Sequence, residues 1–528
     1  MNSEQRNRAP LYEMLEQYRV KGNISYHVPG HKNGKAYAGT TGAGYLSEIM
    51  RYDVTEITGT DDLYHPEGVI KEAQELAAHC FGAEESFFLV GGSTAGNLAL
   101  ILTVCSEPGM ILILQRNVHK SVIHGLMLAG VRAVFLDPLI DPLSGLAVAP
   151  AAETVQAALA AYPDAAAVLI TMPNYYGMGS DLAPLAQACH DSGVPLLVDE
   201  AHGAHYGQHP ALPAGALACG ADGVVQSTHK MLSALTMGAM LHIQGLRLDR
   251  ALLRQRLAMV QSSSPSYPVM ASLDLARRLL HSQGASAFTA GLAAVDILRR
   301  GLAELPRYRL LQPADPQQGA AHLTQDPFKA VIYDVTGVLS GFELQRRLED
   351  RGCVPEMSDD RHVVLLFSLG SKAEDAVRLL EVLREIEAEL QVQTVSAYVE
   401  LEPSSVTGSE SLTTNVGTGG NPAVSSNIST WNNLSKTLIS DPVPFSLKPV
   451  AASHTERIKL EDSMGRVAAE MVIPYPPGIP LLYPGETITG QISRRLTDLA
   501  EGGAKFQACA DPALQHIVVY NIKKGGEG

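Results

Sequence analysis

The sequence predicts an α/β protein whose large domain has a mainly parallel sheet, followed by smaller α+β units. Short apolar runs bounded by turn residues recur at 86–90, 111–115, 133–137, 167–171, 195–200 and 223–227. Helical patterns such as LAPLAQACHDSG (182–193) lie between them. Strands that are apolar on both faces and alternate with helices are typical of a parallel sheet covered on both sides. Polar and small residues follow these runs, at the carboxyl edge where such sheets bind ligands.

The second half of the chain has a different pattern. From about residue 290 to 390, charged helices alternate with shorter strands such as KAVIYDV and HVVLLFSLG, which indicates a smaller α+β domain. Residues 404–433 are rich in Ser, Thr, Asn and Gly, and predict a flexible linker. The Pro-dense run at 473–486 predicts extended chain. The predicted boundaries are 1–60 (N-terminal segment), 61–300 (large domain), 301–395 (small domain), 396–446 (linker) and 447–528 (C-terminal domain).

Charge, cysteine content and hydropathy argue against several classes of protein. The formal net charge of −15 argues against a nucleic-acid partner. The six cysteines are scattered without CxxC spacing, so neither a zinc site nor a disulfide framework is expected. The N-terminal stretch is polar, and no run approaches the ~20 apolar residues of a membrane span. We therefore expect a cytoplasmic protein with no membrane partner.

Asp199 ends the apolar run of PLLVDEAHGAH (195–205), so it lies at the ligand edge of the sheet. A buried carboxylate there is costly unless it is paired. By itself, a residue in this position is more often a helix cap or a metal ligand.

Lys230 follows the next apolar run, in GVVQSTHKM (223–231). Partial desolvation lowers the pKa of a lysine and makes its amine nucleophilic. A single lysine at a strand end is otherwise often solvent-facing.

The segment GGSTAGN (91–97) lies between an apolar run and an apolar helix. It places backbone N–H groups and two hydroxyls at a helix N-terminus, which suits a phosphate, although Ser or Thr there is usually only a cap. Together with Asp199 and Lys230 it matches the needs of pyridoxal 5′-phosphate (PLP): an amine for the aldehyde, an acid for the pyridine nitrogen and a phosphate cradle.

With these and four further motifs, the chain resembles the Orn/Lys/Arg decarboxylases of the aspartate-aminotransferase fold (PLP-dependent transferase, fold type I). The resemblance covers nearly the whole chain except the Ser/Thr-rich linker. The residues that carry it are YHVPGHKNG (26–34), GTDDLYHPEGVI (59–70), GGSTAGN (91–97), RNVHKS (116–121), VDEAHGAH (198–205), QSTHK (226–230) and PYPPGIPLLYPGE (474–486).

The resemblance implies a role for each residue of a PLP site in the 61–300 domain. Lys230 is the Schiff-base lysine and Asp199 pairs with the pyridine nitrogen. The other implied cofactor contacts are the ring-stacking His119, Ala201 on the opposite ring face, His202 near the ring hydroxyl, and the phosphate-site residues Ser93, Thr94, Ala95, Ser227 and His229. His202 and His205 could otherwise form a metal pair, but the motif offers no third ligand, so no metal is expected.

The implied activity is decarboxylation of a basic L-amino acid. Lys230 or His229 returns a proton to Cα once carbon dioxide has left. A distal cation needs carboxylates, and the candidates are Asp61, Asp62, Glu356 and Glu470. The resemblance to short biosynthetic members favours arginine, with agmatine as product, ahead of lysine and ornithine.

The family's active sites lie at a dimer interface, so we expect a homodimer or homotetramer. Since the PGHK motif begins by residue 29, we expect no N-terminal acid-stress domain and a role in polyamine biosynthesis.

One position departs from the family pattern, since Met237 stands where a Gln is expected. It leaves the Lys230–Asp199 chemistry untouched but weakens the substrate assignment. The alternatives are an aminotransferase or lyase, which would share the lysine and the aspartate, an inactive paralogue, and a PLP-binding regulator. No basic helix-turn-helix segment supports the last of these.

Overall fold

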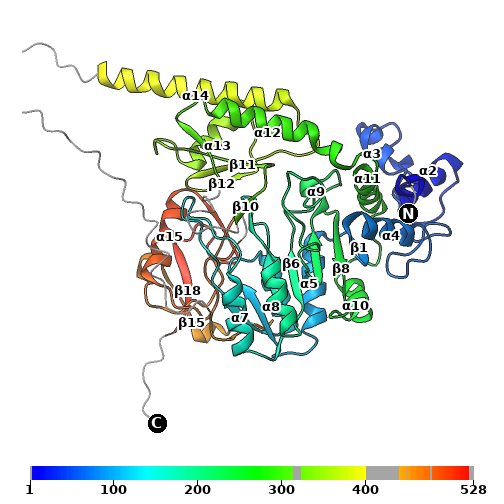
Figure 1. Ribbon diagram of the computed structural model, residues 1–528, viewed down its shortest axis with the longest axis horizontal. Coiled ribbons are helices and arrows are strands. Elements are labelled where there is room, and N and C mark those ends of the chain that lie inside the picture. Colours follow the sequence, from blue (N-terminus) through cyan, green and yellow to red (C-terminus); the bar gives the residue numbers. More distant parts are fainter. Residues whose placement is uncertain (1–2, 313–322, 400–438, 449, 476–478, 522–528) are drawn as a thin grey trace, which may run out of the picture.

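The computed structural model describes residues 3–312, 323–399, 439–448, 450–475 and 479–521. Within these residues, the large domain is built on a sheet of eight strands (Figure 1). In spatial order they are β1 (Glu85–Leu89), β8 (Ala239–Ile243), β7 (Gly223–Gln226), β6 (Leu196–Asp199), β4 (Ala165–Thr171), β2 (Ile111–Gln115), β3 (Arg132–Leu136) and β14 (Val443–Pro444). The five strands from β7 to β3 are parallel, which confirms the predicted fold class.

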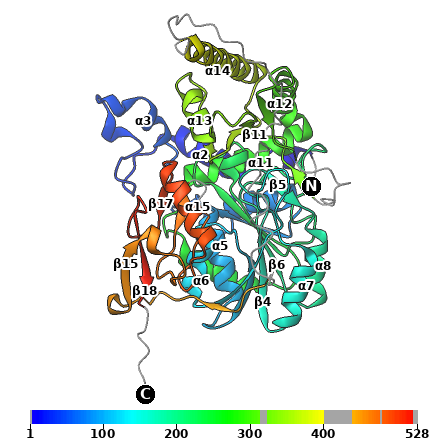
Figure 2. The same ribbon diagram turned by 90° about the vertical axis from the view of Figure 1, so that its left-hand side faces the viewer.

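Helices cover both faces of this sheet (Figure 2). The helices on one face are α5 (Gly92–Val104), α6 (Lys120–Ala129) and α10 (Arg250–Val260), and those on the other are α7 (Ala152–Ala161) and α8 (Ala183–Asp191). Strand β2 serves both cores, because Leu112 and Leu114 pack against the first set while Ile111 and Ile113 pack against the second. Its continuous apolar sequence is therefore required by burial on both sides.

Close helix packing brings α5 onto the sheet beside the future ligand edge. A Cβ on Gly96 would lie 2.8 Å from both Leu89 Cδ1 and Val225 Cγ1. Only glycine lets the helix approach β1 and β7 so closely. The position of the first turn of α5 is thus set by the sequence of GGSTAGN itself.

The N-terminal region packs against the β1 side of the sheet through its own apolar core. Its elements are α1 (Ser3–Arg6), α2 (Pro10–Lys21), the 3-10 turns η1 (Lys35–Tyr37) and η2 (Thr41–Ala43), α3 (Tyr45–Ile49) and α4 (Val69–Phe81). The later helix α11 (Tyr267–Gln283) packs against α2 and α4. Arg277 of α11 is fully buried, where it pairs with Asp274 and donates to the carbonyls of Arg6 (2.9 Å) and Arg8 (2.7 Å). This contact ties the start of the chain to α11.

The small domain has an antiparallel sheet covered by helices. Its strands lie in the order β12 (Met357–Ser358), β13 (His362–Leu366), β11 (Lys329–Asp334) and β9 (Tyr308–Leu310). The other elements are η3 (Gly284–Phe288), α12 (Thr289–Leu302), α13 (Gly341–Glu349), α14 (Ala373–Val399), and β10 (Leu323–Gln325), which pairs with β5 (Met178–Ser180) of the large domain. The predicted α+β pattern is confirmed here.

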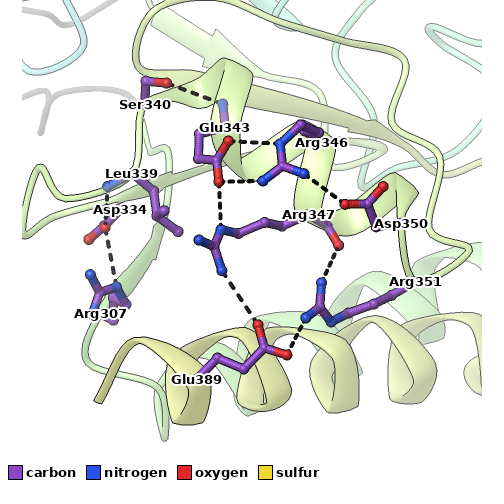
Figure 3. Close-up of polar contacts among 10 residues, drawn as sticks. All are labelled: Arg307, Asp334, Leu339, Ser340, Glu343, Arg346, Arg347, Asp350, Arg351 and Glu389. Carbon is purple, nitrogen blue, oxygen red and sulfur yellow. Dashed lines mark hydrogen bonds and ion pairs between the residues drawn. The ribbon is translucent and has the colours of Figure 1, made fainter. Parts of the chain in front are cut away.

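Ion pairs join two helices on the surface of the small domain (Figure 3). Glu343 of α13 binds Arg346 and Arg347, each at 2.8 Å. Glu389 of α14 then accepts from Arg347 at 3.4 Å and from Arg351 at 2.5 Å. Such surface pairs contribute modestly, about 0–1 kcal/mol each.

The C-terminal unit packs on the large domain beside α6 (Figure 2). It contains η6 (Ala452–His454), η7 (Leu460–Asp462), α15 (Gly490–Glu501) and two strand pairs, β15 (Thr455–Lys459) with β18 (His516–Tyr520) and β16 (Ile473–Tyr475) with β17 (Lys505–Gln507). Tyr483 is buried in the large-domain core, where its ring stacks on Phe135 at 4.9 Å and its hydroxyl donates to Arg116 O at 2.8 Å. The late Pro-rich segment therefore anchors this unit.

Two details differ from the sequence-based expectations. The 86–90 run forms an antiparallel edge strand, paired with the unpredicted strand β8. Residues 440–445, predicted within the linker, return to the large sheet, where β14 pairs with β3. The run 404–433 lies outside the described residues, and the five domain boundaries remain predictions. None of the described helices is both long enough and apolar enough to cross a membrane.

Candidate active site

Lys230 lies in the short helix α9 (Thr228–Met231), directly after β7. Its Nζ lies 2.9 Å from His202 Nε2 and 5.7 Å from the centre of the Tyr175 ring. Burial lowers the pKa of Lys230, although Asp199 and Glu356 partly oppose this. The structure thus places a desolvated amine at the ligand edge, as the sequence predicts.

Asp199 ends β6, the strand next to β7, and is 3% exposed. Its Oδ2 accepts from Asn97 Nδ2 at 2.8 Å, and its Oδ1 accepts from Ala201 N at 3.2 Å. Burial raises the pKa of Asp199, and the Asn97 hydrogen bond and the charge of Lys230 counteract it. A cationic ring nitrogen would supply the missing counter-charge, so this carboxylate fits the pyridine end of PLP.

The predicted phosphate cradle forms a strand–turn–helix junction. Helix α5 begins after Gly91 with no side-chain cap, so the first-turn N–H groups around Ser93, Thr94 and Ala95 are left for another acceptor. Ser227 Oγ and Thr228 Oγ1 are buried, and within the described residues neither has a hydrogen-bond partner. Unpaired buried hydroxyls beside a lysine fit an anionic group that is held by this loop.

Met237, the position that departs from the family pattern, supports this cradle through its backbone. Its carbonyl accepts from Gly92 N at 2.9 Å, and both residues have left-handed φ angles, 75° for Met237 and 71° for Gly92. The Met237 side chain is 53% exposed. The substitution therefore leaves the backbone contact with α5 in place.

His119 caps α6, as its Nδ1 accepts from Ser121 N at 3.2 Å. Ser121 Oγ lies 2.9 Å from the same nitrogen and 3.1 Å from Asn97 Nδ2, which links His119 to the Asp199 pair. Burial and the charge of Lys230 lower the pKa of His119 to about 4. A neutral imidazole held in this way can lie against a flat cofactor ring.

His202 and His229 have different partners. His202 contacts Lys230 and, on its other nitrogen, Lys329, while Tyr175 packs on its ring with centroids 4.2 Å apart. His229 Nδ1 lies 3.0 Å from Gly238 O, so Nδ1 carries the proton and Nε2 stays free to accept one. Burial lowers the pKa values of both histidines. Ala201, two residues after β6, is buried beside Asp199.

His205 does not join this group, because it pairs with Asp326 at 3.0 Å and both side chains are fully buried. The contact holds the segment after β6 against the small domain. His202 therefore contacts two lysines, whereas His205 contacts an aspartate, so the two histidines have separate partners.

The four candidate substrate carboxylates lie in three different places. Glu356 Oε1 accepts from Tyr175 OH at 3.1 Å, and Tyr175 in turn contacts the Lys230 amine, so Glu356 is connected to the site. Asp61 accepts from Gly68 N and Ile70 N at 2.9 Å each, which caps α4, and these bonds keep its pKa low despite burial. Asp62 accepts from Tyr64 N at 2.8 Å.

Glu470 lies in the C-terminal unit, where it accepts from Ala510 N at 2.6 Å and Val518 N at 2.7 Å. Within one chain, Asp61 and Glu470 thus serve backbone amides. The structure connects only Glu356 of the four candidates to Lys230 among the described contacts.

Sequence reasoning missed four residues that build the site, namely Asn97, Ser121, Tyr175 and Lys329. Asn97 gave a usable signal, since a carboxamide inside an otherwise apolar helix needs a buried partner. Lys329 gave none, because a lysine at the start of an apolar strand usually faces solvent. Its burial follows from the docking of the small domain, which no local pattern reveals.

Comparison with known proteins gives consistent matches. The family model described as Orn/Lys/Arg decarboxylase, major domain, matches residues 9–375, and that of the C-terminal domain matches residues 446–507. The Bacillus subtilis protein YaaO is 38% identical over 97% of this chain and 98% of its own length. An arginine decarboxylase of B. subtilis is 30% identical over 98% of both chains.

Two lysine decarboxylases are more distant. LdcA of Pseudomonas aeruginosa is 26% identical over 94% of this chain and 76% of its own. The solved structure of the Escherichia coli constitutive lysine decarboxylase superposes with a TM-score of 0.74 at 22% identity, covering 98% of this chain and 82% of that one. The latter likeness shows a shared fold.

Proposed function

We propose, from the premise that the chain belongs to the Orn/Lys/Arg decarboxylase family, that it converts arginine to agmatine and carbon dioxide. The family makes the chain a PLP-dependent decarboxylase of basic amino acids. Four relatives named arginine decarboxylase match at 28–31% identity over 90–98% of this chain and 96–98% of their own length, whereas LdcA matches at 26% over 76% of its length. That difference favours arginine over lysine, the second candidate.

One observation supports the catalytic assignment above all others. A buried amine and a buried carboxylate follow neighbouring parallel strands, beside an uncapped helix N-terminus. Bound PLP would supply an electron-accepting ring conjugated to the substrate Cα. Lys230 would hold it covalently, Asp199 would keep a proton at its ring nitrogen, and Ser93, Thr94, Ala95, Ser227 and His229 would hold its phosphate.

The remaining residues orient the reacting groups. His119 and Ala201 would hold the ring between them, with His202 on the side of the ring hydroxyl. By fixing how the substrate lies, these residues would make the bond from Cα to its carboxylate the one that breaks, which would select decarboxylation over transamination. Lys230, or His229 after its Nε2 has taken up a proton, would then return a proton to Cα.

We propose that Glu356 binds the positively charged group at the end of the substrate side chain. A carboxylate can accept two parallel N–H bonds from a guanidinium, and Tyr175 OH already orients one of its oxygens at 3.1 Å. Asp61, Asp62 and Glu470 are kept as lower-ranked candidates. They would have to give up backbone bonds or act from a second subunit.

We also propose a homodimer or homotetramer whose sites are completed at an interface, in the cytoplasm and in polyamine biosynthesis. The N-terminal segment exposes large apolar side chains, with Ile24 69%, Tyr26 90% and Tyr45 80% exposed. Exposed apolar residues of this size suit burial against a second copy.

The direct test is an assay of the PLP-loaded protein with arginine, lysine and ornithine, in which released CO₂ is measured and the amine is identified by mass spectrometry. Agmatine from arginine is expected, and cadaverine from lysine alone would move the assignment to lysine. Keto acid without CO₂ would overturn decarboxylation altogether. The Lys230→Ala variant should release no CO₂ and bind no PLP covalently.

A further inference from the structure

Both ring nitrogens of His202 face lysine amines. Nε2 lies 2.9 Å from Lys230 Nζ, and Nδ1 lies 3.1 Å from Lys329 Nζ. His202 is 6% exposed and Lys329 is 3% exposed. Because Lys329 begins β11, the small domain contributes a second buried amine to a site otherwise built by the large domain.

A glycine leaves room for the buried Lys329 side chain. Gly177, with φ +80°, lies so close that a Cβ there would be 2.5 Å from Lys329 Cβ. The Lys329 amine also lies 5.5 Å from the centre of the Tyr175 ring, the same ring that Lys230 faces at 5.7 Å. Tyr175 and His202 therefore separate the two amines and contact both.

The single N–H proton of neutral His202 limits the positive charge that the two lysines can carry. Burial and the two lysines hold the pKa of His202 well below its usual value, so its ring is neutral. A neutral imidazole has one N–H and one lone pair, whereas an ammonium can only donate. If both hydrogen bonds of His202 are kept, one lysine must therefore be an unprotonated amine that accepts the N–H.

The neighbouring charges decide which lysine is neutral. Asp326 and Glu356 stabilise charge on Lys329, and Asp199 and Glu356 stabilise charge on Lys230. When PLP has bound but is not yet joined to Lys230, Asp199 would pair with the ring nitrogen, so the free Lys230 amine would lose that support while Lys329 keeps Asp326.

The other titratable groups facing the cluster are two histidines and Tyr175, whose pKa burial raises so that its hydroxyl stays neutral. His119 and His229 each act on His202, and burial lowers the pKa values of both, so they add little positive charge at neutral pH. Burial lowers the pKa of Lys329 to about 8, so its ammonium form still predominates there.

We propose that Lys329 is a positioning residue that, through His202, keeps the Lys230 amine unprotonated and able to condense with an aldehyde. This inference rests on the proposed role of Lys230. The Lys329 ammonium donates to Nδ1, which fixes the His202 tautomer with its proton on Nε2, and Nε2–H donates to Lys230. An unprotonated amine forms a C=N bond with an aldehyde and releases water, which takes both amine hydrogens. An ammonium must first lose a further proton.

The test measures PLP uptake by the full-length apoprotein as a function of pH, by visible absorbance and by mass spectrometry of borohydride-reduced Lys230. Lys329→Met should raise the pKa of Lys230, and so slow uptake at neutral pH roughly tenfold. Lys329→Arg, which keeps a cation, should retain most of the parent rate. Lys372→Met, at an exposed lysine before α14, is the matched control and should change nothing.

A double-mutant cycle separates transmission through His202 from direct charge repulsion. In a His202→Phe background, Lys329→Met should have little further effect on the pH profile. An equally large shift in that background, or an unchanged profile in the single variant, would overturn the inference while leaving the proposed function intact. If Lys329→Met does not fold, as judged by circular dichroism, Lys329→Gln gives the same readout. Covalent PLP in Lys230→Ala would instead overturn the proposed function.

Discussion

Asn97 Nδ2 donates a 2.8 Å hydrogen bond to Oδ2 of the buried Asp199, and so joins the second turn of α5 to the end of β6. The same amide lies 3.1 Å from Ser121 Oγ, which holds His119. One carboxamide thus orients both the acid expected under the ring nitrogen and the histidine expected against the ring face.

Replacing Asn97 with Leu should raise the pKa of Asp199, because the hydrogen bond favours the charged form that burial disfavours. Ionised Asp199 is needed to hold the ring proton, so the acid limb of the kcat–pH profile should move to higher pH. Thr103→Val, which removes a hydroxyl bonded to Ala99 O on the same helix, is the control. Asp199→Asn should lose turnover at every pH, and an Asn97→Leu profile equal to the parent's would contradict this role.

Glu356→Gln should weaken substrate binding more than it slows the chemical step. Loss of one charge-assisted contact costs about 1.5–3 kcal/mol, so kcat/KM should fall roughly 10- to 100-fold, mainly through KM. Tyr175→Phe removes the 3.1 Å hydrogen bond to Glu356 but keeps the ring, and should have a smaller effect. Steady-state kinetics with arginine decide this, and an unchanged KM would remove Glu356 from the substrate site.

Glu200 makes the stability of the large domain depend on pH. Burial raises its pKa from the usual 4.5 to about 8, although Ala216 N and Gln226 Nε2 donate to it. The folded chain therefore keeps a proton that the unfolded chain releases above about pH 4.5, so this contribution falls between about pH 4.5 and 8.

In Glu200→Gln this contribution is absent. The free energy of unfolding of the variant relative to the parent should therefore increase across the same pH range, on the order of 1 kcal/mol per pH unit, and level off above it. Urea unfolding at several pH values measures the difference. A difference independent of pH would show that Glu200 is already ionised in the folded protein.

Arg277→Met should destabilise the protein by about 3–5 kcal/mol, because Asp274 would be left buried without its cation. The carbonyls of Arg6 and Arg8 would also lose their donor. Guanidinium unfolding measures the loss. The control is Arg300→Met, whose 72% exposed side chain pairs with Asp296 at 3.2 Å and should cost less than about 1 kcal/mol. Equal effects of the two substitutions would contradict the assigned role of Arg277.

The sequence predicts the parallel strands and the residues at their carboxyl ends, because burial on both faces demands continuous apolar runs. Lys230 and Asp199 are found at their expected positions for that reason. The pairing of β1 with β8 was not predictable in this way, since an apolar run shows burial but not strand direction.

Local sequence patterns also do not predict which residues make contacts between domains. Lys329 enters the site from the small domain, and Tyr483 enters the large-domain core from the C-terminal unit. Neither position has a periodic signal, because each depends on how separately folded units pack together. Asp61 is the opposite case, because its motif made it a candidate substrate residue, whereas in the structure its carboxylate caps a helix.

The pairing of β14 with β3 affects how readily two molecules associate through the edge of the large sheet. A bare outer strand offers unpaired amides and carbonyls on which another molecule could add a strand of its own. Here a two-residue segment that includes Pro444 covers part of β3, and a strand so short, with a residue that lacks an N–H, is a poor template for further growth. Variants that detach this segment should therefore be more prone to form fibrous aggregates at high concentration than to lose the fold.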